Sequence, residues 1–570
     1  MTDIKDTTLR GVNLLRNPWF NKSSAFTEEE RDELGLRGLL PPRVSTFDEQ
    51  VTRLKGIIDT YEKPINKYIV LEGAHASDET LYFELLVRYI DQFLPIVYTP
   101  TVGQACLQYS HIFRYARGLY VSTEDKGRVR QLVANVPHKD VDIIVVTDGQ
   151  RILGLGDLGV NGMGIPVGKL ALYTACAGVN PQKTLPVCID VGTNNEELLN
   201  DPLYMGLRQK RVTGPEYDAL IAEFVDAVRE RWPNVVIQFE DFHNSHAYDL
   251  LDQYKDKVPC FNDDIQGTAS VVVTGMFSAM RALKQQLKDQ KVLFLGAGSA
   301  ATGIAHLIAD AMVEEGLTRE EALARIKLFD SKGLVTKKRT APLTSAKLPF
   351  AAEDAPAETF LDAIREIQPT AIIGVSAQGG AFTKECLEEM AKINERPIIF
   401  ALSNPTSKAE CTAEEAYKYT DGRCLFACGS PFNPVEYKGK TFVPRQGNNH
   451  YVFPGIGLGA IFARAKLIPN DVFLVAAKVL ADMVKPEDLE RGSLYPALSQ
   501  VREISAEIGV AVAGYIFDNN LAGIEKPADL KKAVNDAMWD PKHAHFVQEY
   551  SFVLINKNPP MRKTPEDFFT

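Results

Sequence analysis

The stretch KVLFLGAGSAATG, residues 291–303, reads as a buried strand that runs into a turn and then into a helix. The first glycine of the turn permits a tight bend, and the second lets the backbone approach a pyrophosphate closely. The N–H groups at the start of the following helix then point at the phosphates. The pattern predicts a Rossmann-type dinucleotide site whose residues are Gly296, Gly298, Ser299, Ala300 and Ala301.

Charged residues follow the next predicted strand, Ile326–Phe329. Asp330 ends this strand, farther from the glycines than the usual separation of about 20 residues, because a charged helical segment, 318–324, lengthens the connection. Asp330 alone favours NAD, since a carboxylate at this position binds a ribose hydroxyl group. A 2′-phosphate instead needs cations and hydrogen-bond donors, and the chain offers Ser331, Lys332 and Lys347. These residues favour NADP, although a solvated basic loop would have the same composition.

Strands and helices alternate on both sides of this motif. We predict strands at 142–147, 151–155, 186–191, 235–239, 291–295, 326–329, 371–375 and 398–402, with helices at 217–228, 304–312 and 382–392 between them. Such alternation is typical of parallel βαβ units. The chain before residue 116 and after residue 450 reads as mostly helical. In the first part, Thr27 and Glu30 have the spacing of a capping box, and Pro95 and Pro100 predict a short extended segment between them.

Composition and charge exclude several classes of protein. The 570 residues include 63 lysines and arginines against 74 aspartates and glutamates, a net charge of −11 that argues against nucleic-acid binding. An uninterrupted apolar run of about 18 residues, which a membrane helix needs, does not occur. The first residues carry acids and no long apolar segment, so we expect no targeting peptide. The eight cysteines have no metal-ligand or disulfide-framework spacing. We therefore expect a cytoplasmic protein with reduced cysteines.

Four carboxylates stand as two adjacent pairs in apolar surroundings. Glu240 and Asp241 end a predicted strand in VVIQFEDF, and Asp263 and Asp264 begin a helical segment in CFNDDIQG. An acidic pair of this kind is usually a solvated turn, but burying charge among apolar residues is costly unless a cation compensates it. Carboxylate oxygens suit Mg²⁺ or Mn²⁺, and no set of thiolates and imidazoles favours zinc. The sequence therefore predicts a divalent metal site.

A glycine-rich run, GQRILGLGDLGVNGMGIPVGKL at residues 149–170, lets the backbone come close to a ligand. Arg151 is one of its cations, and an arginine can bind a carboxylate through two parallel hydrogen bonds. Lys169 is the other. A desolvated lysine among charges can act as a general base, whereas the alternative interpretation is a surface lysine on a helix.

Neutral polar side chains complete the candidate site. Tyr98 could supply a phenolic proton or could simply pack in the core. Asn404 follows a strand, at the edge where ligands of open α/β sheets bind, and Asn449 lies in a loop. The nine histidines show no metal-ligand spacing, so none is assigned a role.

The motifs together resemble the malic enzymes, over nearly the whole chain. They are FLPIVYTPTVG (93–103), TDGQRILGLGDLGVNGMGIPVGKL (147–170), QFEDF (238–242), FNDDIQGT (261–268), FLGAGSA (294–300), ALSNPT (401–406) and QGNN (446–449). The resemblance implies oxidative decarboxylation of malate to pyruvate and CO₂, with reduction of NADP or NAD and a requirement for Mg²⁺ or Mn²⁺. It also implies a homodimer or homotetramer.

The resemblance also implies a role for each matching residue. Lys169 would be the general base, with Asp263 as its catalytic partner, and Tyr98 would be the general acid. The substrate would be bound by Arg151, Asn404 and Asn449, with Asn404 also near the cofactor. The metal ligands would be Glu240, Asp241 and Asp264. NADP-dependent members are similar to this chain at Ser331, Lys332 and Lys347.

The sequence predicts an α/β protein that has a Rossmann-type dinucleotide-binding domain, a second α/β domain with a parallel sheet, and a helical N-terminal domain. We place a helical oligomerisation domain at 1–116, a central substrate and metal domain at 117–262 and 450–520, the Rossmann-type domain at 263–449, and a C-terminal tail at 521–570. Two alternatives remain open. One is the malolactic enzyme, which converts malate to lactate and CO₂ with bound NAD, and the other is a non-catalytic nucleotide sensor on the same scaffold.

Overall fold

The structure is a computed structural model that describes residues 8–344, 346–351, 353, 355–543 and 546. The chain forms two compact units, one of residues 1–88 with 540–570 and one of residues 89–539. The predicted domain boundaries stay a prediction. The start of the chain and most of the predicted tail, which includes residues 547–570, lie outside the described residues.

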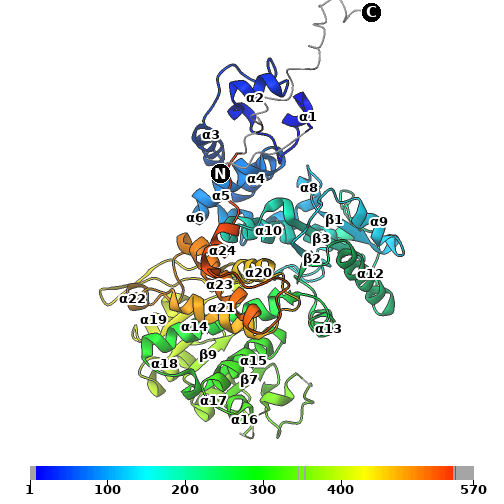
Figure 1. The fold of residues 1–570 in the computed structure, drawn as a ribbon. Coiled ribbons are helices and arrows are strands. Elements are labelled where there is room, and N and C mark those ends of the chain that lie inside the picture. The colour runs from blue at the N-terminus through cyan, green and yellow to red at the C-terminus, as the bar shows by residue number, and fades with distance from the viewer. Residues whose placement is uncertain (1–7, 345, 352, 354, 544–545, 547–570) are drawn as a thin grey trace, which may run out of the picture. The chain divides into compact units, whose positions relative to one another are not determined.

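The first unit is helical, which confirms the predicted helical N-terminal region. Its helices are α1 (Gly11–Leu15), α2 (Glu28–Glu33), α3 (Phe47–Asp59), α4 (Pro64–Ser77) and α5 (Glu79–Arg88) (Figure 1). Helix α2 begins at the predicted capping box, in which the Thr27 side chain accepts from the Glu30 backbone and the Glu30 side chain accepts in return. Because both interactions satisfy otherwise unpaired N–H groups, they fix where this short helix starts.

The second unit begins with α6 (Ile90–Val97), α7 (Thr101–Leu107) and α8 (Tyr109–Ile112). The predicted extended segment between Pro95 and Pro100 is therefore wrong over its first part, because Pro95 lies inside α6. Five residues of this helix, Phe93 and Leu94 among them, are buried. Packing of that apolar face outweighs the backbone hydrogen bond that proline cannot make. Tyr98, directly after the helix, has extended backbone angles.

A five-stranded parallel sheet forms the first α/β layer (Figure 1). Its strands are β1 (Leu119–Ser122), β2 (Ile143–Thr147), β3 (Thr184–Asp190), β4 (Val236–Phe239) and β5 (Cys260–Asn262), in the order β1-β3-β2-β4-β5. The associated helices are α9 (Val129–Ala134), α10 (Gly164–Ala177), α11 (Glu196–Asn200), α12 (Pro215–Arg231) and α13 (Asn244–Tyr254). Strands β2 to β5 are fully buried, as expected for a parallel sheet covered on both faces.

The strand predicted at 151–155 is wrong. This segment forms turns with one isolated bridge between Ile152 and Gly156. Its backbone is instead used to hold Asp241, because the Arg151 N–H donates to the Asp241 carbonyl oxygen at 3.1 Å and the Leu153 N–H donates to the Asp241 side chain at 3.1 Å. The first part of the glycine-rich run, residues 151–155, is thus a loop docked on the end of β4, and the run ends in helix α10.

The second sheet has six strands in the order β11-β10-β9-β6-β7-β8, parallel except for the last pair. They are β6 (Val292–Leu295), β7 (Ile326–Asp330), β8 (Gly333–Leu334), β9 (Ala371–Gly374), β10 (Ile398–Ala401) and β11 (Leu425–Cys428), and β12 (Val435–Tyr437) and β13 (Lys440–Phe442) form a separate hairpin. The helices of this region are α15 (Ser299–Glu314), α16 (Arg319–Ala324), α17 (Phe360–Ile367), α18 (Lys384–Ile393) and α19 (Ala413–Tyr419). The predicted α/β class with a Rossmann-type sheet is confirmed.

The remaining helices of this unit pack against one another and beside the sheets. They are α14 (Thr268–Leu283), α20 (Phe453–Phe462), α21 (Asp471–Asp482), α22 (Pro486–Glu490), α23 (Val501–Asp518) and α24 (Leu530–Ala537). Helix α20 packs on α10 and α23, and α14 packs on α21. In the part of the chain that the structure describes, no helix has both the length and the apolar character needed to cross a membrane.

Candidate active site

Both sheets reverse the direction of strand addition, and the candidate residues follow strands beside such a reversal. In the first sheet the chain adds β3 on one side of β2 and later β4 and β5 on the other. In the second sheet it adds β7 beside β6 and later β9 on the opposite side. Open α/β sheets bind ligands outside the carboxyl ends of strands at such a reversal. The acidic pairs follow β4 and β5, and the glycine-rich turn follows β6.

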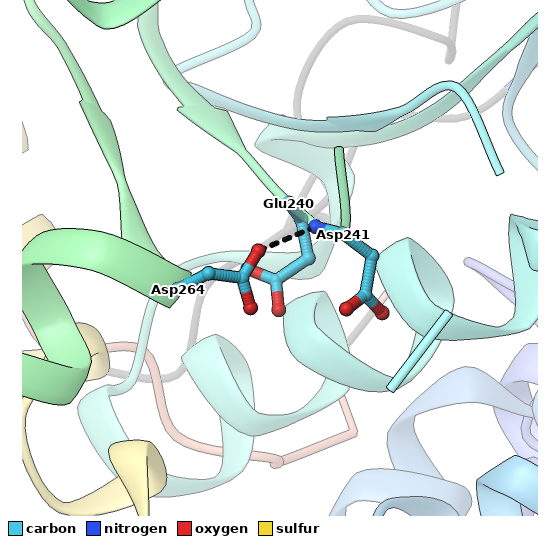
Figure 2. A group of neighbouring side chains, drawn as sticks. All are labelled: Glu240, Asp241 and Asp264. Carbon is cyan, nitrogen blue, oxygen red and sulfur yellow. Dashed lines mark hydrogen bonds between the residues drawn. The ribbon is translucent and has the colours of Figure 1, made fainter. Parts of the chain in front are cut away.

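Three carboxyl groups converge beyond β4 and β5. Glu240, Asp241 and Asp264 each offer an oxygen within 4.8 Å of the others. Figure 2 shows the three side chains side by side, and its dashed line marks the Asp241 N–H donating to Asp264 Oδ2 at 2.7 Å. The φ of Asp241 is +55°, a conformation that non-glycine residues rarely adopt. The strand end is therefore bent so that neighbouring acids in the sequence face one region.

The electrostatics of this cluster call for a cation. Burial raises the pKa of Glu240, Asp241 and Asp264, and repulsion from neighbouring carboxylates, Asp263 included, raises it further. Among the described residues, Asp241 Oδ2 is buried without a hydrogen-bond partner. A divalent ion compensates several carboxylates at once and accepts oxygen ligands of this kind. The donor set fits Mg²⁺ or Mn²⁺.

Lys169 is buried and lies beside this cluster, so the surface interpretation is wrong. Its side chain is 1% exposed, its Nζ lies 2.9 Å from Glu240 Oε1, and it forms a short ion pair with Asp263. The ammonium group also lies over the ring of Phe453, 4.3 Å from its centroid. Burial alone would lower the pKa of Lys169, but Asp263 and Glu240 raise it well above its usual range. The lysine and four acids thus form one charged group inside the protein.

Asp263 is held from two sides. One of its oxygens, Oδ2, contacts Lys169 and accepts from Asn449 Nδ2 at 2.9 Å. The other, Oδ1, has no partner among the described residues. A Cβ on Gly267, one turn farther along the π-helix Asp263–Gly267, would lie only 1.9 Å from Oδ1. The glycine of FNDDIQGT therefore leaves the space that the Asp263 carboxylate occupies.

Replacing Gly267 with alanine is expected to reduce kcat/KM roughly 10²-fold, because displacing a reacting group by about 1 Å can cost that much. The new methyl group would displace the Asp263 carboxylate from the position in which its Oδ2 contacts Lys169. Steady-state kinetics with malate, the substrate that the resemblance implies, measures the effect, and circular dichroism checks the fold. Gly56→Ala is the matched control, since Gly56 lies in helix α3 and no atom of the residues that the structure describes lies within 4 Å of the added Cβ. Unchanged kinetics in Gly267→Ala would contradict the role of this space.

Tyr98 and Arg151 approach the cluster from different elements. The Tyr98 ring is buried, with its centroid 5.4 Å from Lys169 Nζ. Burial raises the pKa of Tyr98 while the charge of Lys169 opposes this, so the phenol stays protonated. Arg151 is exposed in the glycine-rich loop, and its charge lowers the pKa of Asp241 and Asp264. Both predicted residues are therefore near the acids.

Asn404 approaches from the second sheet. It is exposed just after β10, where Ser430 Oγ donates to its Oδ1 at 2.8 Å. A Cβ on Gly154 of the glycine-rich loop would lie 3.4 Å from the Asn404 carbonyl oxygen. The end of the second sheet thus lies against the loop that carries Arg151.

The predicted dinucleotide turn has the expected form. Gly296 has φ +124°, and a Cβ there would lie 2.9 Å from the Val375 carbonyl oxygen after β9. Gly298 precedes α15, and Ser299, Ala300 and Ala301 form its first turn. Among the described residues, no atom lies within 4 Å of a Cβ built on Gly298, so its surroundings leave room for a close ligand.

Beyond β7, the basic residues are arranged around Asp330. Lys347 Nζ lies 2.6 Å from Asp330 Oδ2, and Arg339 binds both carboxylate oxygens at 3.0 and 3.1 Å. Burial would raise the pKa of Asp330, but these hydrogen bonds lower it to about 2. Ser331 and Lys332 are exposed in the adjacent turn. Sequence reasoning did not assign Arg339 a site role, since nothing in the basic loop distinguishes it from its neighbours.

The sequence alone did not indicate three further polar residues near the cluster, because the residues around them in the sequence are typical of a protein core. Gln238 and Tyr173 are fully buried and linked to Glu240 through hydrogen bonds. His450 is also buried, and neither ring nitrogen has a hydrogen-bond partner among the described residues. Burial, helped by the charge of Lys169, lowers the pKa of His450 to about 3.

His450 should make the protein less stable as the pH falls. In the unfolded chain it gains a proton near pH 6.5, whereas the folded protein keeps it neutral down to about pH 3. The unfolded state therefore binds more protons below pH 6.5, and between pH 6.5 and 5 the loss is about 2 kcal/mol. Urea unfolding of His450→Met should show a weaker pH dependence than wild type. Equal slopes would contradict this, and the exposed His243→Asn serves as the control.

Comparison with known proteins identifies the family. The sequence model described as "Malic enzyme, N-terminal domain" matches residues 75–255, and "Malic enzyme, NAD binding domain" matches residues 265–517. The chain belongs to the malic enzyme family. The predicted class, an NAD(P)-dependent malic enzyme acting as a decarboxylating oxidoreductase, is confirmed, and the malolactic alternative is not favoured.

Similar proteins match along almost the whole length. The "NADP-dependent malic enzyme, chloroplastic" of Zea mays is 51% identical over 539 residues, which are 94% of this chain and 85% of that protein. The "NADP-dependent malic enzyme" of Anas platyrhynchos is 51% identical over 543 residues, 95% of this chain and 97% of that protein. The crystal structure of Entamoeba histolytica malic enzyme has a TM-score of 0.56 at 22% identity, covering 89% of this chain and 90% of that one, which shows the shared fold.

Proposed function

We propose that this protein converts malate to pyruvate and CO₂ with reduction of NADP, at the site formed by Lys169, Tyr98 and the acidic cluster. The observation that carries the proposal is the buried group in which Lys169 contacts Glu240 and Asp263, next to three acids that fit a divalent ion. Family membership supports the reaction, and the relatives named NADP-dependent support the cofactor.

Glu240, Asp241 and Asp264 would hold Mg²⁺ or Mn²⁺. When bound, such an ion acts as a Lewis acid that polarises a substrate oxygen and stabilises negative charge developing on it. The positive charge would also offset the carboxylates that raise the pKa of Lys169. Lys169 would then approach the range in which it can accept a proton.

Two side chains around the cluster would carry out the two proton transfers of the reaction. Lys169, oriented by Asp263, would accept the proton of the malate hydroxyl group as hydride leaves the adjacent carbon for the nicotinamide. Tyr98, still protonated because its pKa is raised, would donate a proton to carbon after CO₂ departs. Arg151 would hold a substrate carboxylate, and Asn449 and Asn404 would orient the substrate.

The nucleotide would lie along the turn after β6. Its pyrophosphate would approach the first turn of α15, at Gly296, Gly298, Ser299, Ala300 and Ala301. Ser331, Lys332 and Lys347 would contact the 2′-phosphate. Asp330 would compete with that phosphate for Lys347, which it contacts at 2.6 Å.

We further propose a cytoplasmic protein that forms a homodimer or homotetramer. All eight cysteines are free and buried, which is consistent with a reducing compartment. The oligomeric proposal is supported only by the resemblance, and sedimentation of the purified protein tests it.

The proposed reaction is tested by following the absorbance of the reduced nicotinamide. Purified protein is supplied with malate and Mn²⁺, with NADP or NAD in parallel, and the products are assayed. We expect pyruvate, with NADP reduced more efficiently than NAD. Lactate without net cofactor reduction would overturn the proposal and select the malolactic reaction. No turnover with either nucleotide would favour a sensor.

A further inference from the structure

Two side chains of α10 pair inside the protein with Gln238 of β4 and with Glu240, which directly follows β4. Lys169 and Tyr173 lie four residues apart on the helix, and Gln238 and Glu240 lie two residues apart at the end of the strand. Lys169 contacts Glu240 at 2.9 Å, and Tyr173 Oη donates to Gln238 Oε1 at 2.5 Å. Four helical residues rise about 6 Å, and two strand residues rise about 6.6 Å. The spacings agree, so both pairs form at once.

The amide of Gln238 joins the two pairs and has a defined orientation. Its Nε2 donates to Glu240 Oε2 at 2.8 Å, while its Oε1 accepts from Tyr173. A carboxylate only accepts hydrogen bonds, so the NH₂ end must face Glu240. The other Glu240 oxygen, Oε1, is the one that faces Lys169. Tyr173 therefore holds the Oε1 end of the amide in place, and the Nε2 end binds the Glu240 oxygen that does not face Lys169.

Helix α20 closes this arrangement from the other side. Phe453 lies under Lys169 Nζ at 4.3 Å and has its ring centroid 5.0 Å from that of Tyr173. A Cβ on Gly457 would lie 2.3 Å from the Tyr173 ring, so the helix has a glycine where the tyrosine needs space. Tyr173 and Gln238 are both fully buried. Their hydrogen bonds therefore face no competition from solvent.

We propose that Gln238, held by Tyr173, is a positioning residue that orients the Glu240 carboxylate for divalent metal binding. The inference rests on the proposed metal site at Glu240, Asp241 and Asp264 and adds residues that do not touch the ion. Outer partners that hydrogen-bond a ligand fix its orientation, and their loss typically weakens metal affinity 10–100-fold.

The test measures Mn²⁺ binding to the full-length protein without malate or nucleotide, by the electron paramagnetic resonance signal of free Mn²⁺. We expect Gln238→Met to weaken binding roughly 10–100-fold and Tyr173→Phe to weaken it less. In the Gln238→Met background, Tyr173→Phe should have no further effect, because Tyr173 acts through Gln238. Tyr495→Phe is the matched control. Tyr495 is also fully buried, and its hydroxyl group donates to the Val271 carbonyl oxygen at 3.0 Å.

The outcomes separate the two proposals. Wild-type protein that binds no Mn²⁺ would overturn the metal site and this inference with it. Wild-type binding with unchanged affinity in folded Gln238→Met would overturn the positioning role alone. Additive losses in the double variant would show that Tyr173 does not act through Gln238. If Gln238→Met does not fold, Tyr173→Phe decides on its own, because it removes one hydroxyl group, and affinity equal to that of Tyr495→Phe would overturn the inference.

Discussion

Asp264→Asn should abolish metal-dependent turnover and weaken Mn²⁺ binding by more than about 100-fold, since losing a ligand should exceed the loss of an outer partner. In the wild-type protein, Asp264 Oδ2 accepts a hydrogen bond from the Asp241 N–H at 2.7 Å. The amide oxygen of asparagine can still accept this hydrogen bond. The substitution thus removes charge and keeps shape. NADP affinity should not change, because the dinucleotide turn follows a different strand.

The same substitution should stabilise the metal-free protein. The pKa of Asp264 is raised by burial and by repulsion from Asp263, so its charge opposes folding near neutral pH. Thermal unfolding in EDTA should therefore occur at a higher temperature in Asp264→Asn than in wild type, and Mn²⁺ should add little. Asp252→Asn is the control, because Asp252 is exposed on α13. Full activity in Asp264→Asn would refute the ligand assignment.

Lys169→Met should lower kcat roughly 10²–10⁴-fold, the range expected for a general base. Methionine fills a similar volume but cannot accept the hydroxyl proton. Mn²⁺ affinity should remain unchanged or increase. The reason is that the substitution removes the positive charge of Lys169 Nζ, which lies 2.9 Å from Glu240 Oε1. Steady-state kinetics and Mn²⁺ titration are measured on the same preparation.

The two readouts distinguish a base from a structural ion pair. Removing one partner of a buried pair can cost about 3–5 kcal/mol of stability, so the fraction of folded protein is determined first. Lys183→Met is the control. Lys183 also forms an ion pair, with Asp142 at 3.4 Å, but both side chains are much more exposed than Lys169. If folded Lys169→Met has a kcat similar to that of Lys183→Met, Lys169 is not the general base.

The sequence determined much of the fold because its signals are local. Val- and Ile-rich runs such as Ile143–Thr147 read as buried strands, and Gly296 and Gly298 between a strand and a helix predict a dinucleotide turn. Thr27 and Glu30 form the capping box that their spacing predicts. Two local predictions were wrong, at 151–155 and between Pro95 and Pro100, because buried packing and the docking of the loop on Asp241 outweighed the local preference.

Residue types and motif order were also sufficient for the family and for the candidate residues. Acids in apolar surroundings indicate a compensating cation wherever they lie, because burial of charge is costly in any fold. The sequence alone does not show which side chains contact one another in the folded protein. Tyr173, Gln238 and His450 look like core residues, and Arg339 looks like loop surface.

Only the tertiary structure decided the environment of Lys169. In the sequence it is one lysine at the end of a glycine-rich run, and a surface position on a helix is the ordinary expectation for such a residue. The fold places its Nζ 2.9 Å from Glu240, next to Asp263, and over the rings of Phe453 and Tyr98. Charge interactions depend on distance and burial, and residues far apart in the chain acquire both only when strands β4 and β5, helix α10 and helix α20 pack together.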